Sequence, residues 1–271
     1  MQIIFNHDSI ISIDNIYGKY YLFDFTKPLV VTFAPLNAFI TSSQLDSMPS
    51  PWGFDFMKNS GYNVVSFTCI DNNNWYRSQK FANFLLDSLS PILSKFYTRL
   101  GYGGSMGGYG VSAYANILNL QRVLLLNPIS SLQKSKVPFE TRFDINKESP
   151  LWENYSLDGG VMEASGYVVY DPLFSLDRKQ AQRYKNLTSL KVPGVGHFMP
   201  VHLQNLGILH WVITNFIDNT LEINEFNNKV KDRRKLQQYY QFMLELNANR
   251  NTPWRDKVIT HYQKKYLKNK Y

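Results

Sequence analysis

Cysteine is almost absent from this chain of 271 residues. The one that occurs, Cys69, lies in an apolar run. A single thiol excludes a disulfide framework or a thiolate metal cluster within the chain. We therefore expect Cys69 to be a small buried residue of the core.

Long hydrophobic runs are also missing. The longest, residues 206–217, is too short to span a bilayer and contains His210 and Asn215. The first residues show no basic stretch followed by an apolar one, so no signal peptide is predicted. We expect a cytoplasmic protein, and a peripheral association with a membrane is left open.

An excess of positive over negative charge is nearly absent from most of the chain. The net charge of +8 is uneven: residues 1–220 hold 17 Lys and Arg against 16 Asp and Glu, and residues 221–271 hold 12 against 5. The basic character thus belongs to the C-terminal tail, which argues against nucleic-acid binding by the whole protein. We expect a main domain at 1–220 and a basic helical extension at 221–271.

Strand-like and helix-like patterns alternate in the main domain. Continuous β-rich runs predict strands at 29–33, 63–70, 122–126, 166–170 and 187–192, after antiparallel structure within 10–25. Apolar residues at helical spacing predict a helix over 81–96 that Pro91 bends or splits, and further helices over 177–184, 200–218, 229–246 and from Thr252 onward. This alternation implies an α/β fold with a mostly parallel sheet.

One glycine-rich stretch carries the chemistry. Gly103-Gly-Ser105-Met-Gly107 matches G-x-S-x-G between a predicted strand (96–102) and a predicted helix (109–118). A serine at such a sharp turn needs small neighbours, and the turn lifts its hydroxyl above the edge of the sheet. We interpret Ser105 as a nucleophile; the alternative is a structural turn that happens to contain serine.

A serine hydroxyl needs a base, and histidine has the appropriate pKa. His197 stands in Gly-Val-Gly-His, a loop after the last predicted strand. A carboxylate must then orient the imidazole. Asp171 ends its strand and is favoured, while Asp177 is the alternative acid or merely the N-cap of the following helix.

Together, Gly-Gly-Ser105-Met-Gly-Gly-Tyr-Gly, Tyr-Asp171-Pro-Leu and Gly-Val-Gly-His197 resemble the nucleophile elbow, acid loop and histidine loop of the α/β-hydrolase superfamily. Within it, Trp75-Tyr76-Arg77 and the Ser-Met-Gly-Gly-Tyr elbow are most similar to bacterial proteins of surface-polysaccharide biosynthesis, including capsule O-acetyltransferases. The resemblance spans about residues 20–218 and implies a mostly parallel central sheet flanked by helices.

The resemblance also implies an oxyanion hole. Met106 N–H is one expected donor, and the loop Phe33-Ala-Pro-Leu-Asn37 would supply the other from Ala34 or, alternatively, Leu36. Pro35 has no N–H, and the His-Gly-Gly of many lipases and esterases is missing here.

Other segments are candidates for binding. Trp75, Tyr76 and Arg77 follow a strand end, where aromatic faces suit sugars or acyl chains and arginine suits an anion. Residues 129–165 show no period and hold the position of a lid. The basic tail could contact an acidic polymer, a membrane surface or a protein partner, or it packs on the main domain with solvated lysines.

These residues predict a serine hydrolase that forms an acyl-serine intermediate and requires no cofactor and no metal. The expected substrate is a small acyl ester, such as an acetylated sugar. O-acyl transfer to a bacterial surface polysaccharide is the alternative. A non-catalytic binding module that keeps the fold is the alternative from another class.

Overall fold

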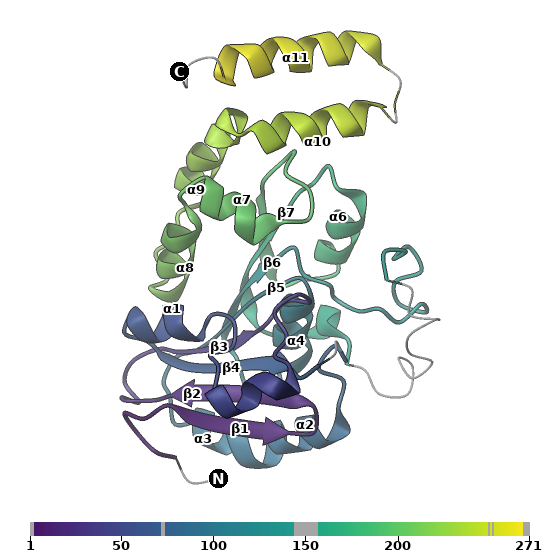
Figure 1. Ribbon diagram of the computed structural model, residues 1–271. Coiled ribbons are helices and arrows are strands. Elements are labelled where there is room, and N and C mark those ends of the chain that lie inside the picture. Colours follow the sequence, from purple (N-terminus) through teal and green to yellow (C-terminus); the bar gives the residue numbers. More distant parts are fainter. Residues whose placement is uncertain (1–2, 72–73, 144–156, 249, 251, 268–271) are drawn as a thin grey trace. The chain divides into compact units, whose positions relative to one another are not determined.

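The computed structural model describes residues 3–71, 74–143, 157–248, 250 and 252–267. Eight strands form a sheet in the order β1-β2-β4-β3-β5-β6-β7-β8. Their bounds are β1 Ser9–Ile13, β2 Ile16–Tyr21, β3 Leu29–Phe33, β4 Asn63–Cys69, β5 Arg99–Gly104, β6 Arg122–Leu126, β7 Ser165–Tyr170 and β8 Leu187–Lys191. β1, β2 and β4 are joined by antiparallel pairs, whereas β3 pairs parallel with β4 and β5, and β5 pairs parallel with β6 (Figure 1).

The central strands are buried along their whole length. Every residue of β3 and β4 is buried, as expected for β-branched and aromatic runs in a parallel sheet that is covered on both faces. Helix α4 (Met106–Tyr114) packs against β3 and β5. Cys69, at the end of β4, is a buried free thiol, which confirms the expectation for it.

The helices are more divided than the periodicity predicts. Along the chain they are η1 Ser42–Ser47, α1 Phe54–Asn59, α2 Gln79–Phe84, η2 Leu85–Leu89, α3 Ser90–Leu93, α4, η3 Gly159–Val161, α6 Ser175–Ala181, α7 Met199–Asn205, α8 Leu209–Ile217, α9 Ile223–Val230, η4 Lys231–Lys235, α10 Gln237–Ala248 and α11 Pro253–Leu267. A π-helical turn, η2, separates α2 from α3 ahead of Pro91. The single helix predicted over 200–218 is wrong: Gly207, at φ +70°, ends α7 before α8 begins.

The chain divides into two compact units. Unit 1 comprises residues 1–168 and 179–188, and unit 2 comprises residues 169–178 and 189–271. Ser105 therefore belongs to unit 1, whereas Asp171, Asp177 and His197 belong to unit 2 together with the basic extension. This division does not coincide with the boundary expected at residue 220.

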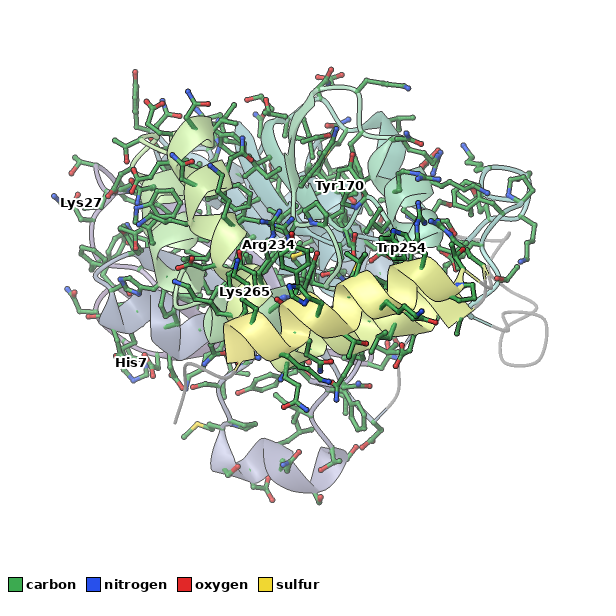
Figure 2. All side chains as sticks on the ribbon, turned by 90° about the horizontal axis from the view of Figure 1, so that it is seen from above. His7, Lys27, Tyr170, Arg234, Trp254 and Lys265 are labelled. Atoms are coloured by element: carbon green, nitrogen blue, oxygen red, sulfur yellow. The ribbon has the colours of Figure 1, made fainter. Side chains whose placement is uncertain are left out.

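Within unit 2, the two last helices lie side by side (Figure 1). The amide of Asn247, near the end of α10, donates hydrogen bonds to the Thr252 carbonyl and to the Asp256 carboxylate, both at 2.8 Å. Figure 2 shows Trp254 and Lys265 towards opposite ends of α11. None of the helices in the described part of the chain is both long enough and apolar enough to cross a bilayer.

Candidate active site

Ser105 stands between β5 and α4, in the context that a nucleophile elbow requires. Its backbone is at φ 50° and ψ −118°, a combination that a residue with a Cβ adopts only under strain. Its N–H donates to the Leu126 carbonyl at 3.0 Å, and its carbonyl accepts from Tyr109 N–H at 3.1 Å. These bonds tie the elbow to β6 and to the first turn of α4.

Two glycines make this turn possible. A Cβ on Gly103 would lie 2.5 Å from the Gly107 carbonyl oxygen, and a Cβ on Gly107 would lie 2.1 Å from the Phe33 carbonyl oxygen. Both obstacles are backbone atoms, so no side chain can move aside. The same close approach places the loop after β3 directly against the start of α4.

The structure gives the expected oxyanion donors different roles. Met106 N–H is the first amide of α4, a position that has no acceptor within its own helix. Ala34 N–H instead donates to the Phe67 carbonyl at 2.9 Å, as part of the sheet. The first choice, Ala34, is therefore corrected: its hydrogen is already used. Leu36, the alternative on the same loop, makes no backbone hydrogen bond through its N–H within the described part of the chain.

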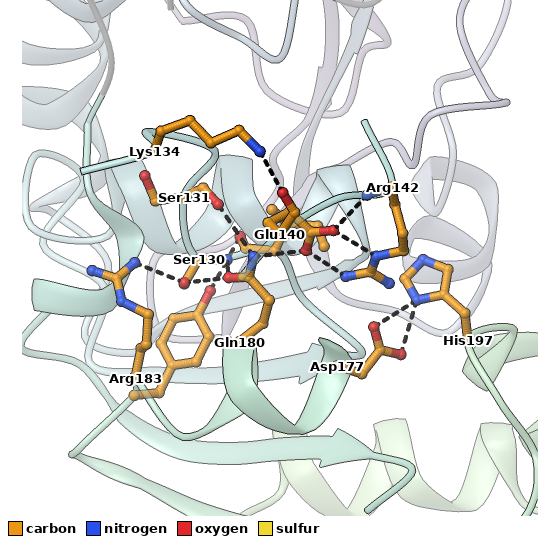
Figure 3. A network of polar contacts seen from close by, with 11 residues as sticks. Ser130, Ser131, Lys134, Glu140, Arg142, Asp177, Gln180, Arg183 and His197 are labelled. Atoms are coloured by element: carbon orange, nitrogen blue, oxygen red, sulfur yellow. Dashed lines mark hydrogen bonds and ion pairs between the residues drawn. The ribbon is translucent and has the colours of Figure 1, made fainter. Parts of the chain in front are cut away.

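In unit 2, the carboxylate that contacts His197 is that of Asp177 (Figure 3). Both carboxylate oxygens lie 2.9 Å from Nδ1 of the imidazole. Asp177 is fully buried in the first turn of α6, while the His197 side chain is 23% exposed. A buried carboxylate on Nδ1 fixes the tautomer and leaves Nε2 to accept a proton. Because α6 begins at Ser175, Asp177 is its third residue and not the N-cap of the helix.

The preference for Asp171 is corrected by its hydrogen bonds. One oxygen of Asp171 accepts from Leu173 N–H at 2.8 Å. The other accepts from Val195 N–H at 2.8 Å and Gly196 N–H at 2.7 Å. Asp171 is fully buried and holds the backbone of the loop that precedes the histidine. Its place at a strand end made it attractive from the sequence, but only Asp177 touches the ring.

The aromatic pair predicted to bind substrate is buried and makes contacts within the fold. Tyr76 is fully buried, and its hydroxyl donates to the Ala34 carbonyl at 2.7 Å, so it supports the loop after β3 instead of lining a surface. Trp75 is 7% exposed and packs edge-on against Phe143, with ring centroids 5.0 Å apart. The Nε of Arg77 donates to the Asn74 carbonyl at 3.1 Å, and burial lowers the pKa of this arginine.

The start of the predicted lid segment, residues 129–165, is anchored by a buried polar network (Figure 3). Glu140 is fully buried; it accepts from Nε and Nη2 of Arg142 at 2.9 and 2.8 Å and from the Gln180 amide at 3.0 Å. No spacing in the sequence pointed to this network, because Gln180 meets the segment only through the fold. Residues 144–156 of the segment lie outside the described residues.

Comparisons with known proteins show which solved structures share this fold. No protein-family model matches the chain, and no curated protein matches its sequence. Among solved structures, the capsule O-acetyltransferase of Neisseria meningitidis serogroup A aligns with a TM-score of 0.50 at 11% identity, over 77% of this chain and 94% of its own. The Pyrococcus horikoshii acylaminoacyl peptidase aligns with a TM-score of 0.51 at 11% identity, over 81% of this chain and 44% of its own.

A third structure, an alpha-beta serine hydrolase homologue from Coxiella burnetii, covers 82% of this chain and all of its own, with a TM-score of 0.45 at 12% identity. At such identities the likeness concerns the fold. The chain has the α/β-hydrolase fold, with a mostly parallel eight-stranded sheet, flanking helices and a C-terminal helical extension. The fold predicted from the sequence is confirmed.

Proposed function

We propose that this protein is a serine-dependent acyl-ester hydrolase that works through an acyl-serine intermediate. The observation that carries the proposal is the strained backbone of Ser105 at the turn between β5 and α4. Backbone strain of this kind persists only where the surrounding structure enforces it, and it is concentrated at active sites. The pairing of Asp177 with Nδ1 of His197 adds a base in the required tautomer.

In the proposed reaction the Ser105 hydroxyl attacks an ester carbonyl while Nε2 of His197 takes its proton. The reaction requires Nε2 to reach this hydroxyl. Asp177 stabilises the imidazolium that forms, and Met106 N–H, with Leu36 N–H as its partner, binds the oxyanion. His197 then returns the proton to the leaving alcohol, and water repeats the sequence on the acyl-serine.

The substrate we propose is a small acyl ester, such as an acetylated sugar. O-acyl transfer to a surface polysaccharide shares the first half of the reaction and differs in the group that attacks the acyl-serine. The likeness to the Neisseria capsule O-acetyltransferase, at a TM-score of 0.50, favours this second candidate.

The test is labelling of the full-length protein with a fluorophosphonate probe, which reacts only with activated serines. Wild type is expected to label and Ser105→Ala to lose all labelling. Ser112→Ala is the matched control, because Ser112 lies on the same helix and is buried. A folded wild type that stays unlabelled would favour a binding module that retains the fold.

Hydrolysis and transfer are separated by supplying an acceptor. Acetyl release from p-nitrophenyl acetate is measured with and without an acidic polysaccharide. A hydrolase releases acetate at the same rate in both. Acetylated polymer that forms with little hydrolysis would replace the hydrolase by the acyltransferase.

A further inference from the structure

The loop that presents the proposed base is rich in glycine and lacks regular secondary structure. Residues 193–197, Pro-Gly-Val-Gly-His, form the histidine loop and contain no helix or strand. Gly194 and Gly196 adopt positive φ, at +82° and +70°. Glycines have the largest backbone freedom to lose on ordering, so this loop needs external contacts to hold an imidazole in one place.

Part of that restraint comes from residues close to the site. Asp171 takes the N–H groups of Val195 and Gly196. The buried ring of His202, on α7, lies beside the backbone of Val195. These contacts fix the middle of the loop. They leave its first carbonyl, that of Pro193, to another partner.

That partner comes from the C-terminal extension. The Nε of Arg233, in η4, donates to the Pro193 carbonyl at 2.8 Å, and its Nη1 donates to the Val230 carbonyl at 3.0 Å. The guanidinium lies over the Tyr239 ring, 5.6 Å from its centroid. Charged donors make stronger hydrogen bonds than neutral ones, and the planar fork of arginine can serve both carbonyls at once.

Aromatic rings of α10 cover the two glycines. A Cβ on Gly194 would lie 2.6 Å from the Tyr239 ring, and one on Gly196 would lie 3.2 Å from the Phe242 ring. Phe174 continues this cover, with ring centroids 6.3 Å from Phe242 and 6.2 Å from His197. The glycines are therefore needed for close packing as well as for their φ.

We propose that three residues of the C-terminal extension, Arg233, Tyr239 and Phe242, hold the histidine loop in place for the reaction. Arg233 is the positioning residue, because it binds the Pro193 carbonyl. The rings of Tyr239 and Phe242 pack against Gly194 and Gly196 of the same loop. The effect on catalysis rests on the proposed function, whereas the effect on loop order does not. The basic extension thus acts on the chemistry through its first half, and α11 takes no part in these contacts.

The experiment compares full-length Arg233→Gln with Arg234→Gln. Arg234 is the next residue, is exposed, and loses the same charge on substitution. Two quantities are measured: hydrogen exchange at the amides of residues 194–197, and the rates of fluorophosphonate labelling and p-nitrophenyl acetate hydrolysis.

For Arg233→Gln we expect faster exchange in the loop, about a tenfold to hundredfold lower kcat and labelling rate, and little change in KM, since misplacing a reacting group by about 1 Å costs rates of this order. Arg233→Lys keeps one charged donor and is expected to recover part of the loss. Arg234→Gln should match wild type in every measurement.

The outcomes separate this proposal from the proposed function. If wild type is not labelled but hydrogen exchange in the histidine loop is faster in Arg233→Gln, the proposed hydrolase function is wrong. The restraint of the loop by Arg233 is then still supported. If folded Arg233→Gln shows the same hydrogen exchange in the histidine loop as wild type, Arg233 does not restrain the loop. If exchange is faster but kcat is unchanged, Arg233 restrains the loop without positioning His197 for the reaction. If Arg233→Gln does not fold, Phe242→Leu, which shortens the cover over Gly196, is read in the same way.

Discussion

Nδ1 of His197 lies 2.9 Å from both carboxylate oxygens of Asp177, twenty residues earlier in the chain. Because the carboxylate faces the ring nitrogen with both oxygens, the imidazole is held in one tautomer and one orientation. The carboxylate oxygens of Asp171, six residues before Asp177, instead accept hydrogen bonds from three backbone N–H groups. The two carboxylates thus have separate duties, which substitution can tell apart.

Asp177→Asn is expected to lower the fluorophosphonate labelling rate by about 10³- to 10⁴-fold, because an amide can stabilise the wrong imidazole tautomer. Asp171→Asn should lower the labelling rate and also the thermal unfolding midpoint. An amide NH₂ cannot accept the backbone hydrogen bonds that the carboxylate accepts. Full labelling of a folded Asp177→Asn would remove Asp177 from the mechanism.

Gly107→Ala is expected to destabilise the protein by about 1–3 kcal/mol or more, because the new methyl meets the Phe33 carbonyl oxygen. Gly160→Ala is the control: its nearest neighbours are the ends of the Arg183 and Asp158 side chains, at 3.2 Å, which can move. Urea unfolding measures both. Equal stabilities of the two variants would contradict the close approach at the elbow.

Glu140 predicts an acid-sensitive contribution to stability. Burial, the largest influence, raises its pKa, but hydrogen bonds from Arg142 and Gln180 and the charge of Arg142 together bring the pKa below its ordinary value of 4.5. A carboxyl with a lower pKa in the folded state stabilises the protein fully above its unfolded pKa. That stabilisation is lost as the pH falls through the folded pKa.

The difference in unfolding free energy between wild type and Glu140→Gln should therefore be largest at about pH 7 and shrink below about pH 4.5. Urea unfolding across this range measures it. Glu163→Gln, at an exposed position, is the control and should show a constant difference. A gap between wild type and Glu140→Gln that does not change with pH would argue against the buried ion pair.

Cys69 is expected to resist alkylation in the native protein. Burial raises the pKa of its thiol to about 12, and Sγ donates to the Asn74 side chain at 3.2 Å. The thiolate, which is the reactive form, is therefore scarce as well as inaccessible. Mass spectrometry after iodoacetamide treatment should find no adduct without denaturant and a full adduct in it. Rapid modification of the native protein would contradict the burial.

Trp254→Ala should leave stability within about 0.5 kcal/mol of wild type and labelling unchanged, because the Trp254 side chain is 72% exposed on α11. The matched aromatic on α10 is Tyr240, which is 2% exposed and donates to the Arg234 carbonyl at 2.7 Å. Tyr240→Ala should cost about 3–5 kcal/mol. Similar losses in the two variants would show that α11 is as important to the fold as α10.

The sequence by itself determined the central strands and the elbow, whereas the helix boundaries came from the structure. The runs at 29–33 and 122–126 became β3 and β6 with unchanged bounds, because continuous β-branched and apolar residues are stable only in a strand buried on both faces. Gly103 and Gly107 likewise revealed the turn, since only glycine tolerates backbone at such distances. These signals are local, so a single chain carries them in full.

The tertiary structure alone decided which groups meet. Asp171 and Asp177 are both carboxylates near one strand end, and the selection of Asp177 depends on where α6 places its first turn beside His197. Ala34 and Leu36 are neighbours, and the sheet claims the N–H of only the first. Arg233 reaches Pro193 across forty residues. Such pairings depend on distances between segments far apart in the chain, which no local pattern of residues encodes.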